Sequence, residues 1–377
     1  MAVFAVALPS GRAATPDRVP IARWKPLPAA SKVHVSKAAR AARARVLGPH
    51  ALDPRYVTLA WYGVSSFIVT IRGHLLLFDA WEIVGAHRDY APIGREELAA
   101  IDPEAILIGH GHFDHAADAG YVAGRSGAAV VGSEEICDQA KAYAEEDGLA
   151  RRFTCAITGT ATVPAPGAIQ SFRLFEDVAP VRVLQHIHSA TRPPSADNPP
   201  DPYAPVFDPA PYVENLQDSP EELQRFLRTL DDQQGGTWMY HFTVGGFTLL
   251  LGDSAGPIWE SEDVRRALDA FPGCVDVMAN AILGFDQPVS GLRDPRLYVE
   301  NAHPRVFLPT HGDAWAPVLS AGQAQYVDEW DAQMAELEHP PKVDFLLDPE
   351  DYLAERAYRV TDRRWRAPMP GSRCARR

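Results

Sequence analysis

The sequence has little cysteine and no long apolar run, and both shortages exclude classes of protein. Its 377 residues include only four cysteines, which are widely spaced and form no C-x-x-C pair. This pattern argues against a dense disulfide framework and against a structural zinc knuckle, but it leaves the redox compartment open. No stretch approaches the roughly 18 consecutive apolar residues that a membrane-spanning helix needs.

Positive charge is also in short supply. The chain has 36 Lys and Arg residues against 49 Asp and Glu residues, which gives a formal net charge of -13. Such a surface repels phosphate backbones, so nucleic acid is not expected as a partner. The apolar fraction of 46% is enough to bury a substantial core in one large domain or two modest ones.

The first 55 residues are rich in Ala, Arg and Pro and predict an N-terminal arm with one short helix near 36–46. Residues 2–8 are apolar and precede small residues, as in the remnant of a signal peptide, but no basic start is present. A cytoplasmic and an exported location are therefore equally open.

The regular fold is expected to begin at residue 56. Three β-type runs form a predicted antiparallel meander, and strands and helices alternate after it. Gly245-Gly246 predicts a hairpin. The expected elements are strands at 57–62, 66–71, 74–78, 105–108, 128–131, 237–244 and 247–251, and a helix at 133–146.

The domain organisation follows from this order. We expect a catalytic domain over 56–318, with a Pro-, Asp- and Tyr-rich loop insertion at 191–218 and a helix that begins at Ser219. Residues 319–377 are expected to complete the domain with one helix and one strand within 319–347, followed by a basic tail.

A cluster of metal-binding residue types follows the predicted strand at 105–108. It reads His110-Gly-His112-Phe-Asp114-His115, which places three imidazoles and a carboxylate within six residues. A turn after a buried strand would bring several of these donor atoms to one point. Imidazole nitrogen and carboxylate oxygen suit zinc, with manganese or iron as alternatives.

This H-x-H-x-D-H segment resembles the hallmark of the metallo-β-lactamase-fold hydrolases. The other motifs of that family have counterparts here, each at or just after the end of a predicted strand, and the resemblance spans about residues 57–315. The matching residues are Asp79, His188, Asp253 and His311.

The resemblance implies a pair of metal ions, most simply two Zn²⁺. His110, His112 and His188 would hold one ion, and Asp114, His115 and His311 would hold the other. Asp253 would bridge them, and Asp79 would orient the histidines. Water on such metals ionises near pH ~7 rather than ~15.7, so a metal-bridging hydroxide is the expected nucleophile, with Asp114 able to accept and pass on a proton.

His186 is the alternative to His188 as a ligand. The two residues are two positions apart, so on a strand they face the same side. We favour His188 because a small hydroxyl residue, Ser189, follows it, as is common in the family. Asp118 and Asp313 are expected to hydrogen-bond near the site.

The implied fold is α+β, a four-layered αββα sandwich with the site at one open edge. The segment Trp61-Tyr62-Gly63-Val-Ser65-Ser66 resembles the UlaG-like and N-acylphosphatidylethanolamine phospholipase D-like branch, whose members cleave lactones or phosphodiesters. Aromatic residues near the expected mouth of the site favour a partly apolar small-molecule substrate. They are Tyr203, Tyr212, Trp238, Tyr240, Phe285 and Trp315.

The expected activity is hydrolysis of a small-molecule lactone, ester or amide by a zinc-dependent enzyme. A phosphodiesterase of the same fold is the alternative. From another class, the chain could be a di-iron oxidoreductase or an oxygen-binding protein on the same scaffold. The sequence does not specify an oligomeric state.

Overall fold

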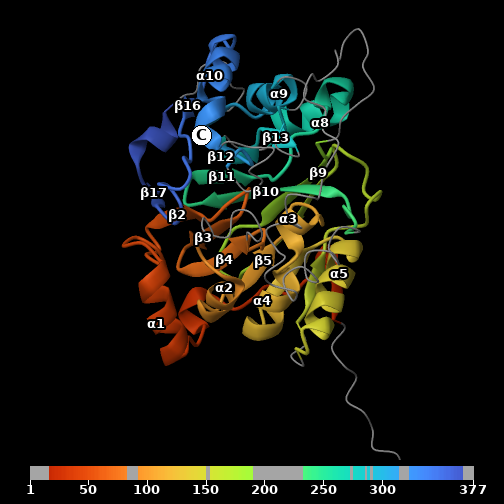
Figure 1. Ribbon diagram of the computed structural model, residues 1–377, viewed down its shortest axis with the longest axis vertical. Coiled ribbons are helices and arrows are strands. Elements are labelled where there is room, and N and C mark those ends of the chain that lie inside the picture. Colours follow the sequence, from red (N-terminus) through yellow and green to blue (C-terminus); the bar gives the residue numbers. More distant parts are fainter. Residues whose placement is uncertain are drawn as a thin grey trace, which may run out of the picture.

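Two β-sheets pack face to face, and helices cover the outer face of each sheet (Figure 1). The structure is a computed structural model, and it describes residues 17–82, 92–149, 153–189, 232–271, 275–284, 287–288, 292–313 and 322–367. This arrangement confirms the expected four-layered αββα sandwich. The predicted loop insertion at 191–218 and the helix expected from Ser219 lie outside the described residues.

The first sheet has the predicted meander at its centre. In the described part of the chain its strand order is β1-β7-β6-β5-β4-β3-β2-β17. The meander strands are fully buried apart from Tyr56, because both of their faces are covered. The strands are β1 (Arg18–Pro20), β2 (Tyr56–Trp61), β3 (Phe67–Ile71), β4 (His74–Phe78), β5 (Ala105–Leu107), β6 (Ala129–Gly132), β7 (Cys155–Ile157) and β17 (Glu355–Arg359).

The second sheet has the order β16-β15-β12-β11-β10-β9-β8 among the described residues. The predicted hairpin is confirmed, since β10 and β11 pair in antiparallel fashion across Gly245 and Gly246, both of which have positive φ. The strands are β8 (Ile169–Phe172), β9 (Val181–His186), β10 (Thr237–Val244), β11 (Phe247–Leu251), β12 (Val275–Ala281), β15 (Pro304–Thr310) and β16 (Lys342–Val343). A separate pair, β13 (Leu283–Gly284) and β14 (Gln287–Pro288), follows β12.

The helices form the outer layers. Apolar side chains from α2, α4 and α5 join the larger core cluster, and those from α8, α9 and α10 form a second cluster over the other sheet. The predicted helix at 133–146 begins where Ser133 accepts a hydrogen bond from Ile136 N. The helices are α1 (Lys37–Val46), α2 (Arg95–Ala100), α3 (Phe113–Ala116), α4 (Ala119–Ser126), α5 (Glu134–Glu146), α8 (Glu262–Asp269), α9 (Arg293–Ala302) and α10 (Val327–Ala335). None of the described helices is both long and apolar enough to cross a membrane.

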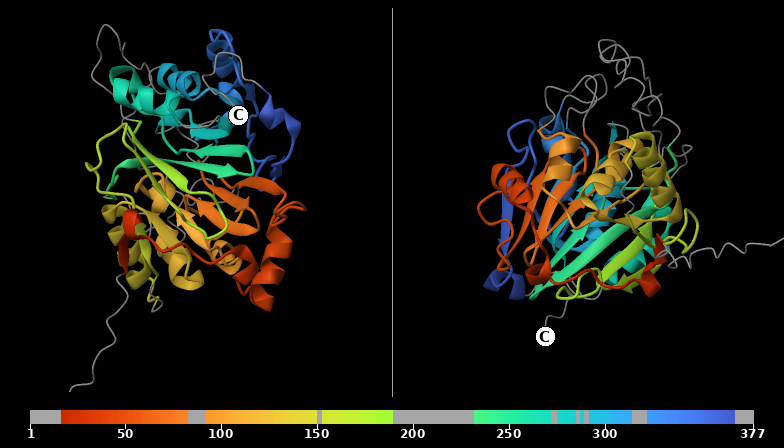
Figure 2. Two further views of the ribbon diagram at one scale, coloured as in Figure 1. Left: turned by 180° about the vertical axis from the view of Figure 1, so that it is seen from behind. Right: turned by 90° about the horizontal axis from the view of Figure 1, so that it is seen from below.

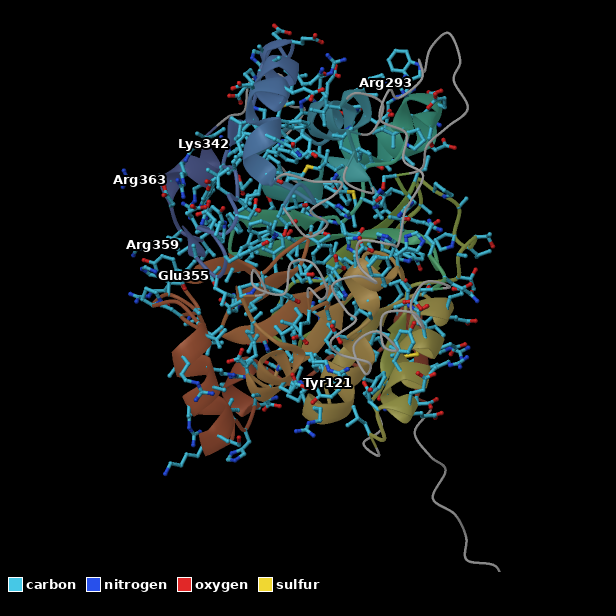
Figure 3. All side chains as sticks on the ribbon, in the orientation of Figure 1. Tyr121, Arg293, Lys342, Glu355, Arg359 and Arg363 are labelled. Atoms are coloured by element: carbon cyan, nitrogen blue, oxygen red, sulfur yellow. A yellow bond between two sulfur atoms is a disulfide. The ribbon has the colours of Figure 1, made fainter. Side chains whose placement is uncertain are left out.

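Both edges of the first sheet come from segments that the sequence pattern did not assign to strands. β1 lies in the expected N-terminal arm and pairs with β7, and the chain from β1 to α1 then crosses the back of the molecule (Figure 2). β17 lies in the expected basic tail and pairs with β2. Glu355 and Arg359, at its two ends, are labelled in Figure 3. These segments are short and polar, so they are strands only because a partner strand is available.

One helix and one strand lie within 319–347, where the sequence predicts them. A 3₁₀ turn, Gln323–Tyr326, leads into α10, which ends at Ala335. Trp330 and Met334 anchor α10 on the second sheet. β16 then adds to the edge of that sheet beside β15.

Candidate metal centre

Five strand ends meet at one edge of the sandwich and carry the residues that the sequence motifs single out. β4 and β5 are parallel neighbours in the first sheet, and β11 and β15 both run parallel to β12 in the second. β9 has the same direction as β11 because both are antiparallel to β10. Carboxyl ends of parallel strands meet at the same edge, where α/β sheets commonly bind ligands. The residues that follow these ends are Asp79, His110, His188, Asp253 and His311.

The first trio consists of His110, His112 and His188. His110 Nε2 lies 3.2 Å from His112 Nδ1 and 3.0 Å from His188 Nε2. His110 is buried, whereas His112 and His188 are partly exposed. Solvent therefore reaches the centre on the side of this trio.

The second trio consists of Asp114, His115 and His311, all of which are buried. Asp114 Oδ2 lies 3.2 Å from His115 Nε2 and 3.2 Å from His311 Nε2. The two Nε2 atoms are 3.3 Å apart. Asp114 and His115 reach this position because the chain turns into α3 directly after His112.

Two further carboxylates orient the histidines from behind. Asp253 Oδ2 lies 2.8 Å from His110 Nδ1 and 3.5 Å from His115 Nδ1. Asp79 Oδ2 lies 2.9 Å from His115 Nδ1. In this arrangement both carboxylates contact the ring nitrogens that point away from the two trios. The bridging role of Asp253 stays a prediction, as do the individual ligand assignments.

Electrostatics divide the site into two halves. Burial lowers the pKa of His110 and His188 well below the usual range, and the neighbouring histidines lower it further. Burial opposes the charged form of His115 as well, but Asp114, Asp253 and Asp79 outweigh it and raise its pKa well above the usual value. The first trio therefore offers neutral nitrogens, and the second holds both signs of charge.

The acidic groups follow the same logic. Burial, and then the charge of Asp253, raises the pKa of Asp79 to about 7. Burial also raises the pKa of Asp253. For Asp114, burial is outweighed by the charge of His115 and by hydrogen bonds from His115 and His311, which hold its pKa well below the usual range. Asp114 is therefore ionised.

These features fit a metal pair. The ligand atoms within each trio lie within 4.8 Å of one another. Neutral imidazole nitrogens that converge on one point suit a cation, and zinc accepts nitrogen and carboxylate oxygen together. Two adjacent trios with this chemistry could hold two ions side by side.

The choice between His186 and His188 is explained by where β9 ends. His186 is the last residue of β9, and its Nδ1 lies 2.8 Å from the hydroxyl of Tyr298 in α9. Burial lowers the pKa of His186 to about 4. The chain leaves the strand directly afterwards, and this brings His188, but not His186, to the first trio.

Asp118 and Asp313 both make hydrogen bonds near the site. Asp118 accepts from Glu82 N at 2.7 Å. Asp313 accepts from Val64 N at 3.1 Å and from the hydroxyl of Tyr352 at 2.7 Å. Burial raises the pKa of Asp313 to about 7.

Three supporting residues were missed in the sequence. Ser65 Oγ lies 3.0 Å from His115 Nδ1, and Gln139 Nε2 donates to Gly111 O at 2.6 Å. Gly109 leaves room for the Asp253 carboxylate, because a Cβ at that position would overlap it. Spacing does not reveal such roles, since serine, glutamine and glycine are common residues with no fixed position relative to the motif.

The expected aromatic mouth is wrong for the two members that the structure describes. Trp238 and Tyr240 lie in β10 and are fully buried between the sheets. The hydroxyl of Tyr240 donates to Ile108 O at 2.8 Å. Alternation along β10 directs both side chains into the core. The other four aromatic residues lie outside the described residues.

Among histidines without motif support, His74 has a structural role. It is fully buried, with Nδ1 2.9 Å from Glu104 Oε2 and Nε2 2.7 Å from Asp177 Oδ1. Its ring stacks on Phe175 with centroids 3.8 Å apart. Burial lowers the pKa of His74, but the two carboxylates outweigh this and raise it overall. The side chain therefore joins β4 to the loop after β8.

The fold and the site together define a class: an αββα sandwich with a histidine- and aspartate-rich centre at the ends of its strands. The family model described as the metallo-beta-lactamase superfamily matches residues 59–311, about two thirds of the chain. The chain belongs to this superfamily.

Individual relatives are similar over shorter stretches. A metal-dependent hydrolase of Pyrobaculum neutrophilum is 37% identical over 78 residues, which is 21% of this chain and 33% of the relative. One from Dinoroseobacter shibae is 32% identical over 127 residues, 33% of this chain and 53% of the relative. The matched stretches thus span about a third to a half of these relatives. Among solved structures, a metallo hydrolase from the archaeon Ignicoccus hospitalis has 15% identity, covers 80% of this chain and 98% of its own, and has a TM-score of 0.49.

Proposed function

We propose that the chain is a dinuclear metal-dependent hydrolase that cleaves a lactone, ester or amide bond in a small molecule. One observation carries the proposal: two adjacent trios of metal-binding side chains converge at the strand ends, each with ligand atoms within 4.8 Å of one another. Membership of the metallo-beta-lactamase superfamily and short similarities to proteins named as metal-dependent hydrolases support it.

A bound metal pair would supply two kinds of chemistry, a water molecule of lowered pKa and polarisation of the scissile carbonyl. The residues of the chain prepare the site for this. The low pKa of His110 and His188 keeps these nitrogens neutral and able to bind. Asp79 and Asp253 fix the ring orientation of His115 and His110 through their Nδ1 atoms, as acidic partners of metal-binding histidines commonly do.

Asp114 is the candidate for proton transfer. Its carboxylate is ionised, and its Oδ2 lies 3.2 Å from the Nε2 atoms of both His115 and His311. A carboxylate in this place can accept a proton from the attacking water and pass it to the leaving group. His112 and His188 are the partly exposed members of the site, so we infer that substrate approaches from their side.

The test begins with metal analysis of the purified protein by plasma mass spectrometry. We expect about two zinc ions per chain, and loss of most of the metal and nearly all turnover in His110→Ala and Asp253→Ala. His339→Ala, which removes an exposed histidine that belongs to neither trio, is the control and should retain both metal and turnover. Two metals in each of the first two variants would contradict the site assignment.

The same preparation separates the alternatives. Hydrolysis within a panel of lactones, esters and amides would support the proposal, whereas turnover confined to phosphodiesters would favour a phosphodiesterase. Two irons with a redox-active visible chromophore would instead favour an oxidoreductase or oxygen-binding protein. Zinc is the proposed metal because it binds imidazole nitrogen and carboxylate oxygen together, with manganese or iron as alternatives.

Of the two locations left open by the sequence, we propose an exported one. Cys137 of α5 and Cys155 of β7 form a disulfide, with Cα atoms 6.1 Å apart. Disulfides persist mainly in oxidising compartments, so this bond supports export. Fractionation of the native host tests the proposal, and recovery of the protein only from the cytoplasm would overturn it.

A further inference from the structure

The C-terminal segment, residues 342–367, reaches the metal centre through the side chain of Tyr352. The Tyr352 hydroxyl donates to Asp313 Oδ2 at 2.7 Å. Its ring packs against Trp61, with centroids 4.6 Å apart. Asp313 lies two residues after His311. The C-terminal segment therefore contacts a residue that lies close in sequence to His311 of the second trio.

The Asp313 carboxylate fixes a strained turn. Both of its oxygens lie 3.1 Å from Val64 N, which donates to them. Val64 O in turn accepts from His311 N at 3.0 Å. Val64 has a φ of 50°, in the left-handed region that a β-branched residue rarely adopts. Such a conformation persists only if its surroundings hold it, and Asp313 is the buried group that binds its amide.

The same turn also touches the other histidine of the second trio. Ser65, next to Val64, places its hydroxyl 3.0 Å from His115 Nδ1 and 3.2 Å from Asp79 Oδ2. One turn of two residues thus contacts the backbone of His311 and the ring of His115. A shift of this turn would move both of these ligands.

The first trio is held by other elements. Gly111, between its first two histidines, donates its N–H to Gln234 O at 2.7 Å and accepts from Gln139 Nε2 at 2.6 Å. Gln139 lies in α5, which packs near β6 and β7, whereas β17 is the edge strand at the other end of the first sheet. Gln139 therefore supports the first trio and the turn at Val64 and Ser65 supports the second, while Asp253 contacts a histidine of each.

We propose that Tyr352 and Asp313 are positioning residues that set the metal affinity of the second trio without altering that of the first. The inference rests on the proposed metal-dependent function. Loss of the Tyr352 hydroxyl would leave a buried carboxylate oxygen without this donor and would loosen the turn at Val64 and Ser65. Removal of such outer partners typically costs 10- to 100-fold in metal affinity.

The test compares Tyr352→Phe with a matched control, Tyr358→Phe. Tyr358 is in β17 of the same C-terminal segment and is buried, but its hydroxyl has no hydrogen-bond partner among the described residues. Metal-free protein is titrated with Zn²⁺ in competition with a chromophoric chelator, which yields two stepwise affinities. We expect Tyr352→Phe to weaken one step, the step that is lost in His311→Ala, by at least ~10-fold and to leave the other within about twofold. Tyr358→Phe should match the wild type at both steps.

Each other outcome has a distinct meaning. If the wild type binds two ions and Tyr352→Phe binds both unchanged, the inference is wrong and the proposed function stands. Equal weakening of both steps, or equal weakening by Tyr358→Phe, would also overturn it, because a general loss of structure would then explain the effect. If the wild type binds no metal, the proposed function itself fails.

Discussion

Substitution of Gly109 by alanine would test whether close packing around the Asp253 carboxylate builds the metal centre. The backbone at this position is fixed on both sides, since Gly109 N donates to Asp79 Oδ1 at 3.0 Å and its carbonyl accepts from Trp238 N at 2.8 Å. A new Cβ would overlap the Asp253 carboxylate. The carboxylate must then retreat by on the order of 1 Å to restore van der Waals separation, which would break its contact with His110 Nδ1.

The expected cost has two parts. Overpacking of a tightly packed site costs about 1–3 kcal/mol in free energy of unfolding. Displacement of a carboxylate that orients a metal-binding histidine costs about 10- to 100-fold in metal affinity. We expect Gly109→Ala to lose stability in this range and to bind zinc at least ~10-fold more weakly than wild type.

Urea unfolding of the metal-free protein measures the first effect, and chelator competition measures the second. Gly94→Ala is the matched control, because the nearest atom to its new Cβ, Glu82 Oε1, would be at an ordinary 3.4 Å. Gly94 is the N-cap of α2 and has a φ of -88°, which alanine adopts readily. If Gly109→Ala is as stable as Gly94→Ala and binds zinc as tightly as the wild type, the metal centre does not depend on close packing around the Asp253 carboxylate.

Three further predictions follow from contacts outside the trios. Because the pKa of His74 is raised in the folded protein, its contribution to stability is fully present below its unfolded pKa of ~6.5 and is lost as pH rises through the folded value. The difference in unfolding free energy between wild type and His74→Phe, measured in urea, should therefore shrink from pH 6 to pH 9. A constant difference would contradict this. Gln139→Leu removes the donor to Gly111 O and should weaken ~10-fold the Zn²⁺ binding step that Tyr352→Phe leaves unchanged. An effect confined to the step that Tyr352→Phe weakens would be contrary evidence. Alkylation of the denatured, unreduced protein followed by peptide mass spectrometry should leave Cys137 and Cys155 unmodified unless a reductant is added, and modification without reductant would rule out the bond.

Much of the fold could be predicted because its central strands carry their own signal. The run at 75–78 is apolar throughout and forms most of β4, which is buried on both faces. The motif at 110–115 was equally informative, because its four donor residues lie within one short segment, and a turn after the buried strand brings their side chains close together. The order of strands and helices then supported two packed sheets.

Other parts depend on partners that a local pattern does not contain. β17 has the sequence Glu-Arg-Ala-Tyr-Arg, and only its pairing with β2 makes it a strand. The choice between His186 and His188 depends on where β9 ends, and side-chain alternation cannot reveal that. The hydrogen bond between Tyr352 and Asp313 joins residues 39 positions apart, with α10 and β16 between them, so no local pattern predicts it.

The pairing of β17 with β2 also constrains when the protein can be completed. Glu355 lies opposite Ala60, 295 positions later in the chain. At a synthesis rate of about 5–20 residues per second, the edge of β2 waits roughly 15–60 s on the ribosome for its neighbour. An open strand edge is a template for wrong pairing during that interval. A segment made 295 residues after Ala60 therefore closes an edge of the first sheet that is open to wrong pairing in the meantime.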